Sequence, residues 1–498
     1  MDGTEDSQSL AEIIGSRAHS RPDSVFLEDA RSDRVLSYAE FAAAVTRWIE
    51  QMDELALPNG GAVVIAVRDP LAFAVVHLAA ISAGRRSVPI NPDLHDGEPA
   101  RSATLIEAPG FIVVDRGVDV SAVDGWVMLT VDAVGAPEVV AGPSRSLESA
   151  GALADGGAAV LFTSGSTGTP KGVELPEKQL LIVARSVADN NRLSADDRGF
   201  NSLPLFHVNA EVVALLATLV AGATLVLDSA FHRTGFWDLV LARRITWLNA
   251  VPAILAVLTR DGEPIPETGL RFIRSASAPL PDGVRAALGD IPLVLSWGMT
   301  EGASQITVTP IGDQGHSGSV GRPLGAEVEV RGPDGERAPL GEIGALWIRG
   351  PGIISRYLFD RAADRFDGNG WLSTGDIGSL DADGYVYLAG RSDDVINRGG
   401  EKVYPAEVEE VLLGDPRVLE AVVVARADDV LGSVPVAYVI PVDRDDQVNE
   451  SLLDDLRSRC ASELPRFKRP IEIALVADLP RAPTGKVQRS KVRELAAL

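Results

Sequence analysis

The sequence predicts an α/β fold with a large N-terminal domain of parallel-sheet subdomains, a small β-rich subdomain and a small α+β domain at the C-terminal end. Three observations lead to this prediction. Short β-branched runs alternate with helical segments in the first part of the chain, strands separated by Pro-Asp-Gly and Asp-Gly turns follow, and a chain of 498 residues is too long for one compact core. We therefore expect more than one domain.

The N-terminal part shows the pattern of a parallel sheet covered by helices on both faces. Ala62 to Val67 is typical of a buried strand, and Leu71 to Ala83 is typical of the helix that follows it. The longest apolar run, Val212 to Leu227, is shorter than a membrane span and is interrupted by polar residues. We expect a buried helix there that turns at Ala221-Gly222 into the buried strand Thr224 to Leu227.

A different pattern begins near residue 319. The strand runs Ala326 to Val330, Ala345 to Ile348 and Tyr385 to Leu388 are separated by turn sequences, which favours a small antiparallel subdomain. The polar, glycine-containing segment Gly390 to Asp394 then marks a domain boundary. We expect an N-terminal domain over 1–390, with subdomains of roughly 1–160, 161–318 and 319–390, a hinge at 391–394 and a C-terminal domain over 395–498.

The C-terminal region predicts a small α+β module in which helices and strands alternate. The expected elements, in order, are helix Pro405 to Leu413, strands Ala421 to Val424 and Val436 to Ile440, helix Glu450 to Leu464, strand Ile471 to Leu475, and a final helix from about Ser490.

Charge and cysteine content exclude several classes of function. The formal net charge of -24 argues against broad binding to nucleic acid and against a position on anionic lipid. Cys460 is the only cysteine, so an internal disulfide and a cysteine-rich metal site are excluded. The first residues are acidic and polar, unlike a signal peptide. We expect a cytoplasmic protein that acts on small molecules and does not insert into a membrane.

A loop rich in hydroxyl groups and glycine follows an apolar run and ends at a lysine. Glycines let the backbone approach an anion, the hydroxyls donate hydrogen bonds and the lysine supplies charge, so the loop predicts a phosphate cradle for a nucleotide. It differs from an ordinary P-loop because Gly172 stands where a magnesium-binding hydroxyl would be needed. Its candidate ATP-binding residues are Thr163, Ser164, Gly165, Ser166, Thr167, Gly168 and Lys171.

Four further motifs follow in order along the chain. They are Trp297-Gly298-Met299-Thr300-Glu301, Ser373-Thr374-Gly375-Asp376, Gly390-Arg391-Ser392-Asp393-Asp394 and Pro483-Thr484-Gly485-Lys486. Together with the first loop, they resemble the adenylate-forming superfamily of acyl-CoA synthetases, peptide-synthetase adenylation domains and luciferases. The resemblance extends from Leu36 to Lys486 and implies ATP, Mg²⁺ and CoA as substrates and cofactors.

The resemblance implies roles for the residues that would bind the nucleotide and the metal. Trp297 lies where the family usually has a tyrosine against adenine, and Gly298 and Met299 follow it. The implied contact of Thr300 is the α-phosphate, and that of Glu301 is magnesium. The segment Ser275, Ala276 and Ser277 borders adenine and the acyl pocket, while Asp376 and Arg391 hold the ribose.

Other roles concern catalysis and the moving domain. Lys486 corresponds to the lysine that neutralises the carboxylate and phosphate during adenylation, and Asp393 to the hinge of a mobile C-terminal domain. Gly399 and Gly400 correspond to the loop that lines the CoA channel. His207 matches a histidine beside the carboxylate, and the expected acyl pocket consists of His207, Val208, Asn209, Glu211, Ala276 and Gly298.

Several positions depart from the family pattern. Pro176-Glu177 replace a hydroxyl residue and a histidine, Ala276-Ser277 replace a glycine-containing pair, and Glu211 replaces an apolar or amide residue. If the Glu211 side chain points inward, it could pair with a basic substituent of the acid. The malonate-specific type has an arginine where this chain has Leu219-Val220, which disfavours a dicarboxylate and leaves aryl acids and short or medium acyl chains.

The expected reaction is activation of a carboxylic acid by ATP to an acyl-adenylate, followed by transfer to CoA. An amide bond synthetase, in which an amine attacks the same adenylate, is the main alternative. A carrier-protein loading domain is less favoured because no carrier domain follows Lys486, and nothing supports light emission. A nucleotide sensor without catalysis would lack Lys486 or Glu301, and both are present.

Overall fold

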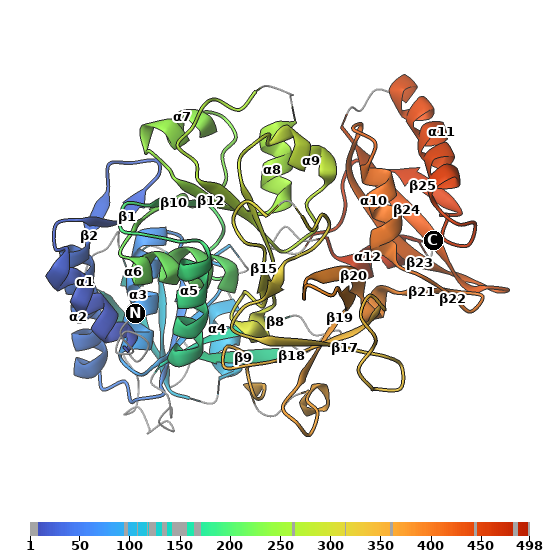
Figure 1. The fold of residues 1–498 in the computed structure, drawn as a ribbon. Coiled ribbons are helices and arrows are strands. Elements are labelled where there is room, and N and C mark those ends of the chain that lie inside the picture. Colours follow the sequence, from blue (N-terminus) through green and yellow to red (C-terminus); the bar gives the residue numbers. More distant parts are fainter. Residues whose placement is uncertain are drawn as a thin grey trace.

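The computed structural model describes residues 8–93, 98–106, 108–116, 118, 126–131, 137–141, 157–163, 171–260, 264–313, 315–358, 362–442, 446–481 and 487–496. Figure 1 shows two large sheets with their helices on one side of the molecule, a smaller β-rich region below the middle and an α+β region at the other end. The functional residues come mainly from the second large sheet and the β-rich region.

The first large sheet consists of parallel strands with one antiparallel strand at each edge. Its order is β7-β6-β5-β3-β4-β8-β9, and the antiparallel partners are β7 beside β6 and β9 beside β8. Its strands are β3 (Ala62–Ala66), β4 (Arg86–Pro89), β5 (Gly110–Asp115), β6 (Trp126–Val131), β7 (Glu138–Ala141), β8 (Ala158–Thr163) and β9 (Lys171–Pro176).

The second large sheet has the order β16-β15-β14-β13-β12-β10-β11-β1-β2. From β14 to β1 every neighbouring pair is parallel, so these strands have their carboxyl ends at one edge. Its strands are β1 (Val25–Asp29), β2 (Val35–Ser37), β10 (Arg198–Asn201), β11 (Thr224–Leu227), β12 (Trp247–Ala250), β13 (Phe272–Ser275), β14 (Leu293–Trp297), β15 (Thr307–Val308) and β16 (Arg322–Pro323).

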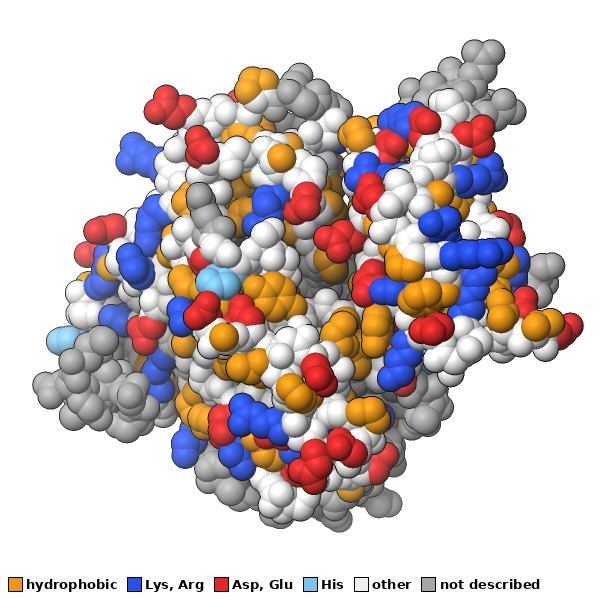
Figure 2. All heavy atoms as spheres, turned by 45° about the vertical axis from the view of Figure 1, so that its right-hand side comes forward, with side chains coloured by type: hydrophobic (Ala, Val, Ile, Leu, Met, Phe, Trp, Pro, Cys, Tyr) orange, Lys and Arg blue, Asp and Glu red, His pale blue; other side chains and the backbone are white. Residues whose placement is uncertain are grey.

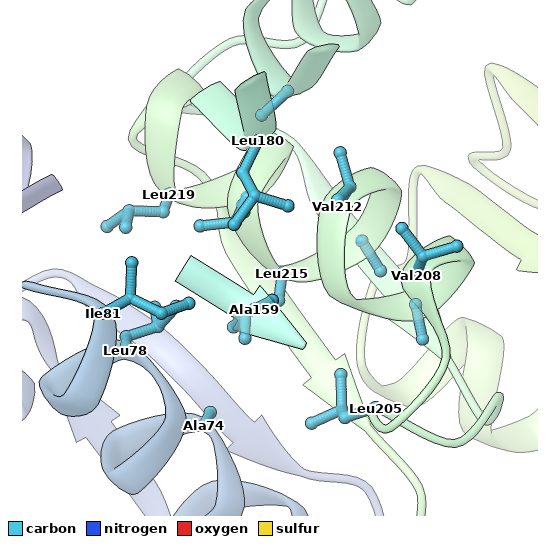
Figure 3. Packing of buried hydrophobic residues seen from close by; sticks show 14 of the residues in the cluster. Ala74, Leu78, Ile81, Ala159, Leu180, Leu205, Val208, Val212, Leu215 and Leu219 are labelled. Atoms are coloured by element: carbon cyan, nitrogen blue, oxygen red, sulfur yellow. The ribbon is translucent and has the colours of Figure 1, made fainter. Parts of the chain in front are cut away.

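Helix α3 (Pro70–Ser82) contacts both large sheets and is mainly apolar on all of its faces. It contacts β3 and β4 of the first sheet and β1 of the second, and each residue from Leu71 to Ile81 is buried. A helix without a polar face is stable only in such surroundings. Figure 3 shows its Leu78 and Ile81 packed near Leu215 and Leu219 of the segment that follows His207.

The remaining helices of the large region cover the faces of these sheets. Two of them begin at capping boxes, in which Ser9 and Ser37 each pair with the glutamate three positions later. They are α1 (Leu10–Ser20), α2 (Tyr38–Glu54), α4 (Glu98–Thr104), α5 (Glu177–Asn190), the π-helix η2 (Asn209–Leu216), α6 (Ala217–Ala221), α7 (Phe236–Ala242), α8 (Pro252–Thr259), α9 (Asp282–Ala287), and the short 3-10 helices η3 (Thr300–Gly302) and η5 (Ala363–Arg365).

The β-rich region is an antiparallel sheet of β17 (Glu327–Arg331), β18 (Gly344–Arg349), β19 (Leu372–Leu380) and β20 (Val386–Arg391). A short 3-10 helix, η6 (Ser392–Asp394), leads from it into the C-terminal region. There the sheet order is β22-β21-β24-β23 with β25 beside β24. The elements are β21 (Ile396–Arg398), β22 (Glu401–Val403), α10 (Pro405–Leu413), β23 (Val418–Asp428), β24 (Gly432–Pro441), α11 (Asp446–Glu463), β25 (Glu472–Leu475) and α12 (Arg489–Ala496).

The predicted α/β class is confirmed, and so is the antiparallel character of the segment near residues 319–388. The expected subdomain limit at residues 160 and 161, however, does not follow the sheets. Strands β1 and β2 come from the start of the chain but belong to the second sheet, where β1 pairs with β11 and β2 pairs with β1. Strand β9 lies beyond residue 161 but closes the first sheet. Within the described residues, no helix has the length and apolar character that a bilayer crossing requires.

Candidate active site

The carboxyl edge of the second sheet gathers polar side chains from neighbouring strands. Cross-strand register places Asn201 opposite Asn249, and Asn249 opposite Arg274. Residues opposite one another in a ladder share a face of the sheet. The Asn249 amide donates to Asn201 Oδ1 at 3.0 Å and to Asn209 Oδ1 at 3.2 Å. Asn209 begins the π-helix η2, so this network connects the sheet edge to the segment of His207.

The motif from Trp297 to Glu301 forms a tight turn directly after β14. A Cβ atom on Gly298 would lie 1.5 Å from the Ser304 carbonyl oxygen, so only glycine fits this close approach. Ala303 and Ser304 have φ values of 47° and 86°, a left-handed conformation that costs non-glycine residues energy. Such strain in consecutive residues is typical of functional turns.

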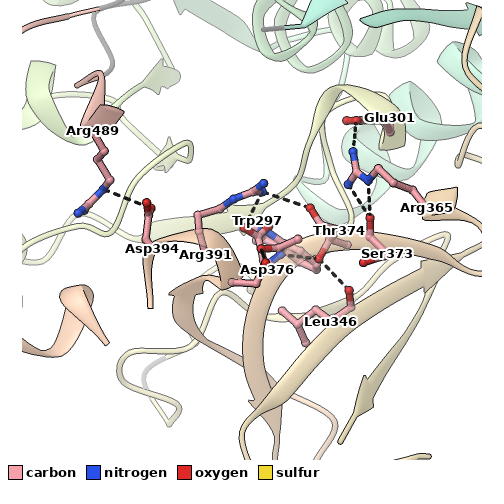
Figure 4. A network of polar contacts seen from close by, with 12 residues as sticks. Trp297, Glu301, Leu346, Arg365, Ser373, Thr374, Asp376, Arg391, Asp394 and Arg489 are labelled. Atoms are coloured by element: carbon pink, nitrogen blue, oxygen red, sulfur yellow. Dashed lines mark hydrogen bonds and ion pairs between the residues drawn. The ribbon is translucent and has the colours of Figure 1, made fainter. Parts of the chain in front are cut away.

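Asp376 lies at the centre of the predicted ribose site. Its Oδ2 accepts a hydrogen bond from Trp297 Nε1 at 2.9 Å, and its Oδ1 accepts one from Arg391 Nη1 at 3.0 Å. Figure 4 shows Trp297, Asp376 and Arg391 converging from three segments of the chain. Tryptophan in place of the usual tyrosine therefore supplies an N–H donor that orients the carboxylate. The Thr374 hydroxyl fixes the backbone of Asp376 by accepting from its N–H at 3.0 Å.

Glu301 is held from the β-rich side of the site. Its Oε1 accepts from the Tyr357 hydroxyl at 2.6 Å and from Arg365 Nη1 at 3.1 Å. Burial, followed by the nearby Glu301 charge, raises the pKa of Tyr357, which therefore stays a hydrogen-bond donor. The Lys171 ammonium lies 5.9 Å from the centre of the Tyr357 ring. Tyr357 and Arg365 belong to no motif that the sequence singled out.

The buried Glu301 carboxylate has the chemistry that Mg²⁺ prefers, namely an oxygen ligand. Both described donors contact Oε1, so the carboxylate is oriented by the protein rather than by the metal. The residues present thus fit a magnesium ion, which Glu301 would hold.

His207 lies in a turn immediately before the π-helix. Burial lowers the pKa of its ring to about 4, so the imidazole is neutral near pH 7. Its Nε2 is buried and has no hydrogen-bond partner among the described residues. The Phe206 ring contacts it edge-on at 4.6 Å between centroids. A neutral ring with an unused nitrogen is suited to contact a substrate oxygen.

The segment Ser275 to Ser277 continues from β13 at the same edge. Ser277 has φ +78°, so a serine adopts the left-handed conformation at the position where the family pattern has a glycine-containing pair. The buried Ser275 hydroxyl lacks a partner among the described residues. Ala276 is buried between them.

Glu211 and Glu177, two departures from the family pattern, have partners within the protein. The Glu211 carboxylate lies 3.1 Å from His77 Nε2 of α3, and both side chains are fully buried. The Glu211 side chain is thus turned toward His77 in the core between η2 and α3. Glu177 Oε1 accepts from the Leu10 backbone N–H at 2.6 Å and attaches α1 to α5.

Gly399 and Gly400 form the two-residue turn between β21 and β22. Their φ values are 61° and 94°, so the turn itself requires glycine or a residue that tolerates this conformation. A Cβ on Gly400 would meet no atom within 4 Å. Figure 1 shows this hairpin projecting from the C-terminal region away from the two large sheets.

The predicted hinge, Asp393, lies in the 3-10 helix η6. Its carbonyl oxygen accepts from Arg493 Nη2 of α12 at 3.0 Å, and the neighbouring Asp394 carboxylate pairs with Arg493 and lies 3.6 Å from Arg489 Nε. Figure 2 shows a furrow between the C-terminal region and the rest of the molecule.

Two predicted elements, the loop residues 164–170 and Lys486, lie outside the described residues. The first loop lies between β8, which ends at Thr163, and β9, which starts at Lys171. The structure adds residues that the motifs do not include: Asn249, Arg274, Ser296 and Gln305 at the sheet edge, and Tyr357 and Arg365 beside Glu301. Cross-strand register, which local patterns do not encode, brings the first group together.

Comparisons with known proteins identify two regions of the chain. The family model described as AMP-binding enzyme matches residues 15–358, and the one described as AMP-binding enzyme C-terminal domain matches residues 407–486. A sulfoacetate–CoA ligase of Cupriavidus necator is 35% identical over 513 residues, which cover 97% of each chain. An oxalate–CoA ligase of Arabidopsis thaliana is 35% identical over 351 residues, 68% of each chain.

A solved structure has the same architecture over nearly the whole chain. It is the o-succinylbenzoate CoA synthetase from Bacillus subtilis in complex with an acyl-adenylate intermediate. The TM-score is 0.82 at 28% sequence identity, and the alignment covers 98% of both chains. The fold of this chain is therefore similar, from end to end, to that of a protein solved with an acyl-adenylate.

Proposed function

This chain belongs to the AMP-binding enzyme family, and on that premise we propose that it is an AMP-forming carboxylic acid–CoA ligase. The observation that carries the proposal is the convergence of Trp297 and Arg391 on Asp376, with Glu301 in the next turn, at the carboxyl edge of a parallel sheet. Nucleotides bind at this edge in open α/β sheets.

In the first step, a carboxylate oxygen of the acid attacks the α-phosphorus of ATP and pyrophosphate leaves. Asp376 and Arg391 hold the ribose, and Thr300, in the turn after β14, contacts the α-phosphate. Glu301 would hold a magnesium ion, which would supply positive charge that favours the departure of pyrophosphate. Lys486 neutralises the charge that develops between carboxylate and phosphate. The neutral His207 ring contacts the acid next to its carboxylate.

In the second step, the CoA thiol attacks the carbonyl carbon of the adenylate, AMP leaves and the thiol proton passes to solvent. The hairpin at Gly399 and Gly400 projects away from the large sheets in this structure, so it must move before it can line a CoA channel. We assign that rotation to the linker 391–394 with Asp393 as its hinge, between an N-terminal domain ending at residue 390 and a C-terminal domain from residue 395.

An amine could replace CoA in the second step, because the acyl-adenylate reacts with either nucleophile. The relatives named above are CoA ligases, and this favours CoA for this chain. The acids in their names, sulfoacetate and oxalate, are short and carry two acid groups. We place the reaction in the cytoplasm, where a lone thiol such as Cys460 stays reduced.

The experiment that tests the proposal is isotope exchange between pyrophosphate and ATP over a panel of carboxylic acids. We expect exchange that depends on Mg²⁺ and on one class of acid and that needs no CoA. Adding CoA should convert the same acid to a thioester. Exchange without a thioester, but with an amide when an amine is supplied, would show the amide synthetase instead.

A further inference from the structure

Arg274 is a fully buried cation surrounded by neutral groups. Its side chain is 0% exposed. The guanidinium donates from Nη1 to Asn209 Oδ1 at 3.1 Å and to Asn249 Oδ1 at 3.3 Å. From Nη2 it donates to Ser296 Oγ at 2.7 Å and to Gln305 Oε1 at 3.4 Å. All four acceptors are uncharged, and within the described part of the chain no carboxylate forms an ion pair with Arg274.

A buried charge without a counter-charge is costly, and proteins normally pair it. Arg271, just before the same strand, is paired in the usual way, because it forms an ion pair with Asp197. For Arg274, burial lowers the pKa of the guanidinium to about 9, with no neighbouring carboxylate to raise it again. The side chain still carries its charge near pH 7, and that charge lacks an anion.

Other polar groups around Arg274 are also incomplete. Buried atoms with no hydrogen-bond partner among the described residues include Arg274 Nε, Gln305 Nε2, the Ser275 hydroxyl and His207 Nε2. Of these residues, Gln305 contacts Arg274 directly, and His207 lies two positions before Asn209, which also contacts Arg274. Ser275 follows Arg274 on β13, so its side chain points to the opposite face of the sheet. Orphaned buried polar atoms next to an unpaired cation indicate the place of an anionic ligand.

We propose that Arg274 is the specificity residue of the acyl site and binds a second anionic group of the acid, a sulfonate or a second carboxylate, while the first carboxylate reacts beside His207. This inference rests on the proposed function and specifies its substrate class as short acids with two anionic groups. The donor available for this contact is Arg274 Nε–H, because the four described acceptors use both hydrogens of Nη1 and both of Nη2. Asn209, Asn249, Ser296 and Gln305 position the fork.

The inference reverses the expectation based on Leu219-Val220, which disfavoured a dicarboxylate. Leu219 is buried in the main apolar core near Ile81, and the Val220 carbonyl oxygen accepts from Arg17 of α1. These residues contact the core and α1, so the absence of an arginine there leaves the charge of the acyl site undetermined. Arg274 supplies the positive charge from a different strand.

The test compares each dianionic acid with a neutral isostere. The pairs are sulfoacetate with tert-butylacetic acid, and malonate with malonamate, and the measured quantity is kcat/KM for pyrophosphate release. We expect wild-type enzyme to prefer one dianion over its isostere by about 100-fold, the scale of a buried charge contact. The pair that shows the preference identifies sulfonate or carboxylate. In Arg274→Met, the ratio of kcat/KM for the dianionic acid to kcat/KM for its neutral isostere should be close to one.

Two variants separate substrate recognition from general effects. Asn209→Asp places an internal carboxylate beside the guanidinium, so it should raise thermal stability while removing the preference for the dianion. Arg349→Met removes an exposed ion-paired arginine on β18 and should leave the ratio unchanged. If Arg274→Met lowers both acids of a pair equally and lowers the melting temperature, Arg274 only supports the sheet edge and the inference is overturned.

The failure of the inference can be distinguished from failure of the proposed function. If the enzyme activates acids without a second charged group but neither sulfoacetate nor malonate, the proposed role of Arg274 is overturned. The proposed ligase function would still be supported. If wild-type enzyme releases no pyrophosphate with any acid, the ligase proposal fails. The inference is then decided by thermal shift with sulfoacetate or malonate in the presence of α,β-methylene-ATP. Stabilisation of wild type but not of Arg274→Met supports it, and equal or absent stabilisation overturns it.

Discussion

Single side chains determine the chemistry at the sheet edge. The Trp297 N–H and the Arg391 guanidinium donate to different oxygens of Asp376, which orients this side chain before a ribose arrives. Tyr357 and Arg365 do the same for Glu301. Preorganised carboxylates of this kind avoid reorganisation during the reaction. The motifs predicted both carboxylates and also Trp297 and Arg391, but not Tyr357 and Arg365, which orient Glu301.

At this scale, His207 makes a prediction about pH. Its folded pKa is about 4, whereas an unfolded histidine titrates near 6.5, so above that pH both states are neutral and stability is unaffected. As pH falls from about 6.5 to 4, only the unfolded chain takes up the proton. We expect this residue to lower the free energy of unfolding by up to about 1.4 kcal/mol per pH unit in that window.

The measurement is urea unfolding of wild type and His207→Gln at several pH values between 4 and 7.5. Glutamine keeps a polar side chain but does not titrate there, so the variant should lose less stability on acidification than wild type. Parallel pH profiles for the two proteins would mean that the His207 ring has the same pKa in the folded and the unfolded state.

At the scale of elements, the β21–β22 hairpin combines a turn requirement with a predicted function. Both glycines of the turn have positive φ, so any larger residue strains the backbone by about 1–2 kcal/mol whether or not a channel passes there. Gly335 offers a matched control, because it also has positive φ, 82°, and open space around a built Cβ.

We therefore expect Gly400→Leu and Gly335→Leu to lower thermal stability by similar amounts and to leave pyrophosphate release nearly normal. Only Gly400→Leu should abolish thioester formation, because its side chain would fill the CoA channel after domain rotation. Thioester output that falls equally in both variants would assign the effect to backbone strain and remove Gly400 from the acceptor site.

Elements formed by local patterns were predictable, and those formed by distant pairing were not. The limits of α10 and of β11 agree with the sequence prediction because β-branched runs, proline and glycine mark them locally. The pairing of β1 with β11 and the closure of the first sheet by β9 depend on contacts between distant segments. The Arg274 network has the same origin, since register alone brings Asn249 beside it.

At the scale of the whole molecule, the linker connects the nucleotide site to the C-terminal region. Arg391 contacts Asp376, and two residues later the Asp393 carbonyl oxygen accepts from Arg493 of α12. One end of this short segment thus contacts β19 of the β-rich region, and the other contacts α12. A rotation of the C-terminal region must change backbone dihedrals between these attachments.

Asp393→Pro should therefore uncouple the two half-reactions. Proline fixes φ near -65°, and we expect thioester formation to fall by about 100-fold, the rate equivalent of the roughly 3 kcal/mol cost of a misplaced proline, while pyrophosphate exchange persists. Asp393→Ala keeps backbone freedom and is the control, with both half-reactions close to wild type. Equal loss of both half-reactions in the proline variant would place the hinge elsewhere.

The central claim is that a carboxylate oxygen attacks the α-phosphorus of ATP and that a thiol then displaces AMP. The most direct test uses the preferred acid with both carboxylate oxygens replaced by heavy oxygen, together with ATP, Mg²⁺ and CoA, and mass spectrometry of all products. The account predicts acyl-CoA and AMP in equal amounts, with one heavy oxygen in each AMP and none in pyrophosphate. Heavy oxygen absent from AMP, or present in pyrophosphate or phosphate, would contradict it.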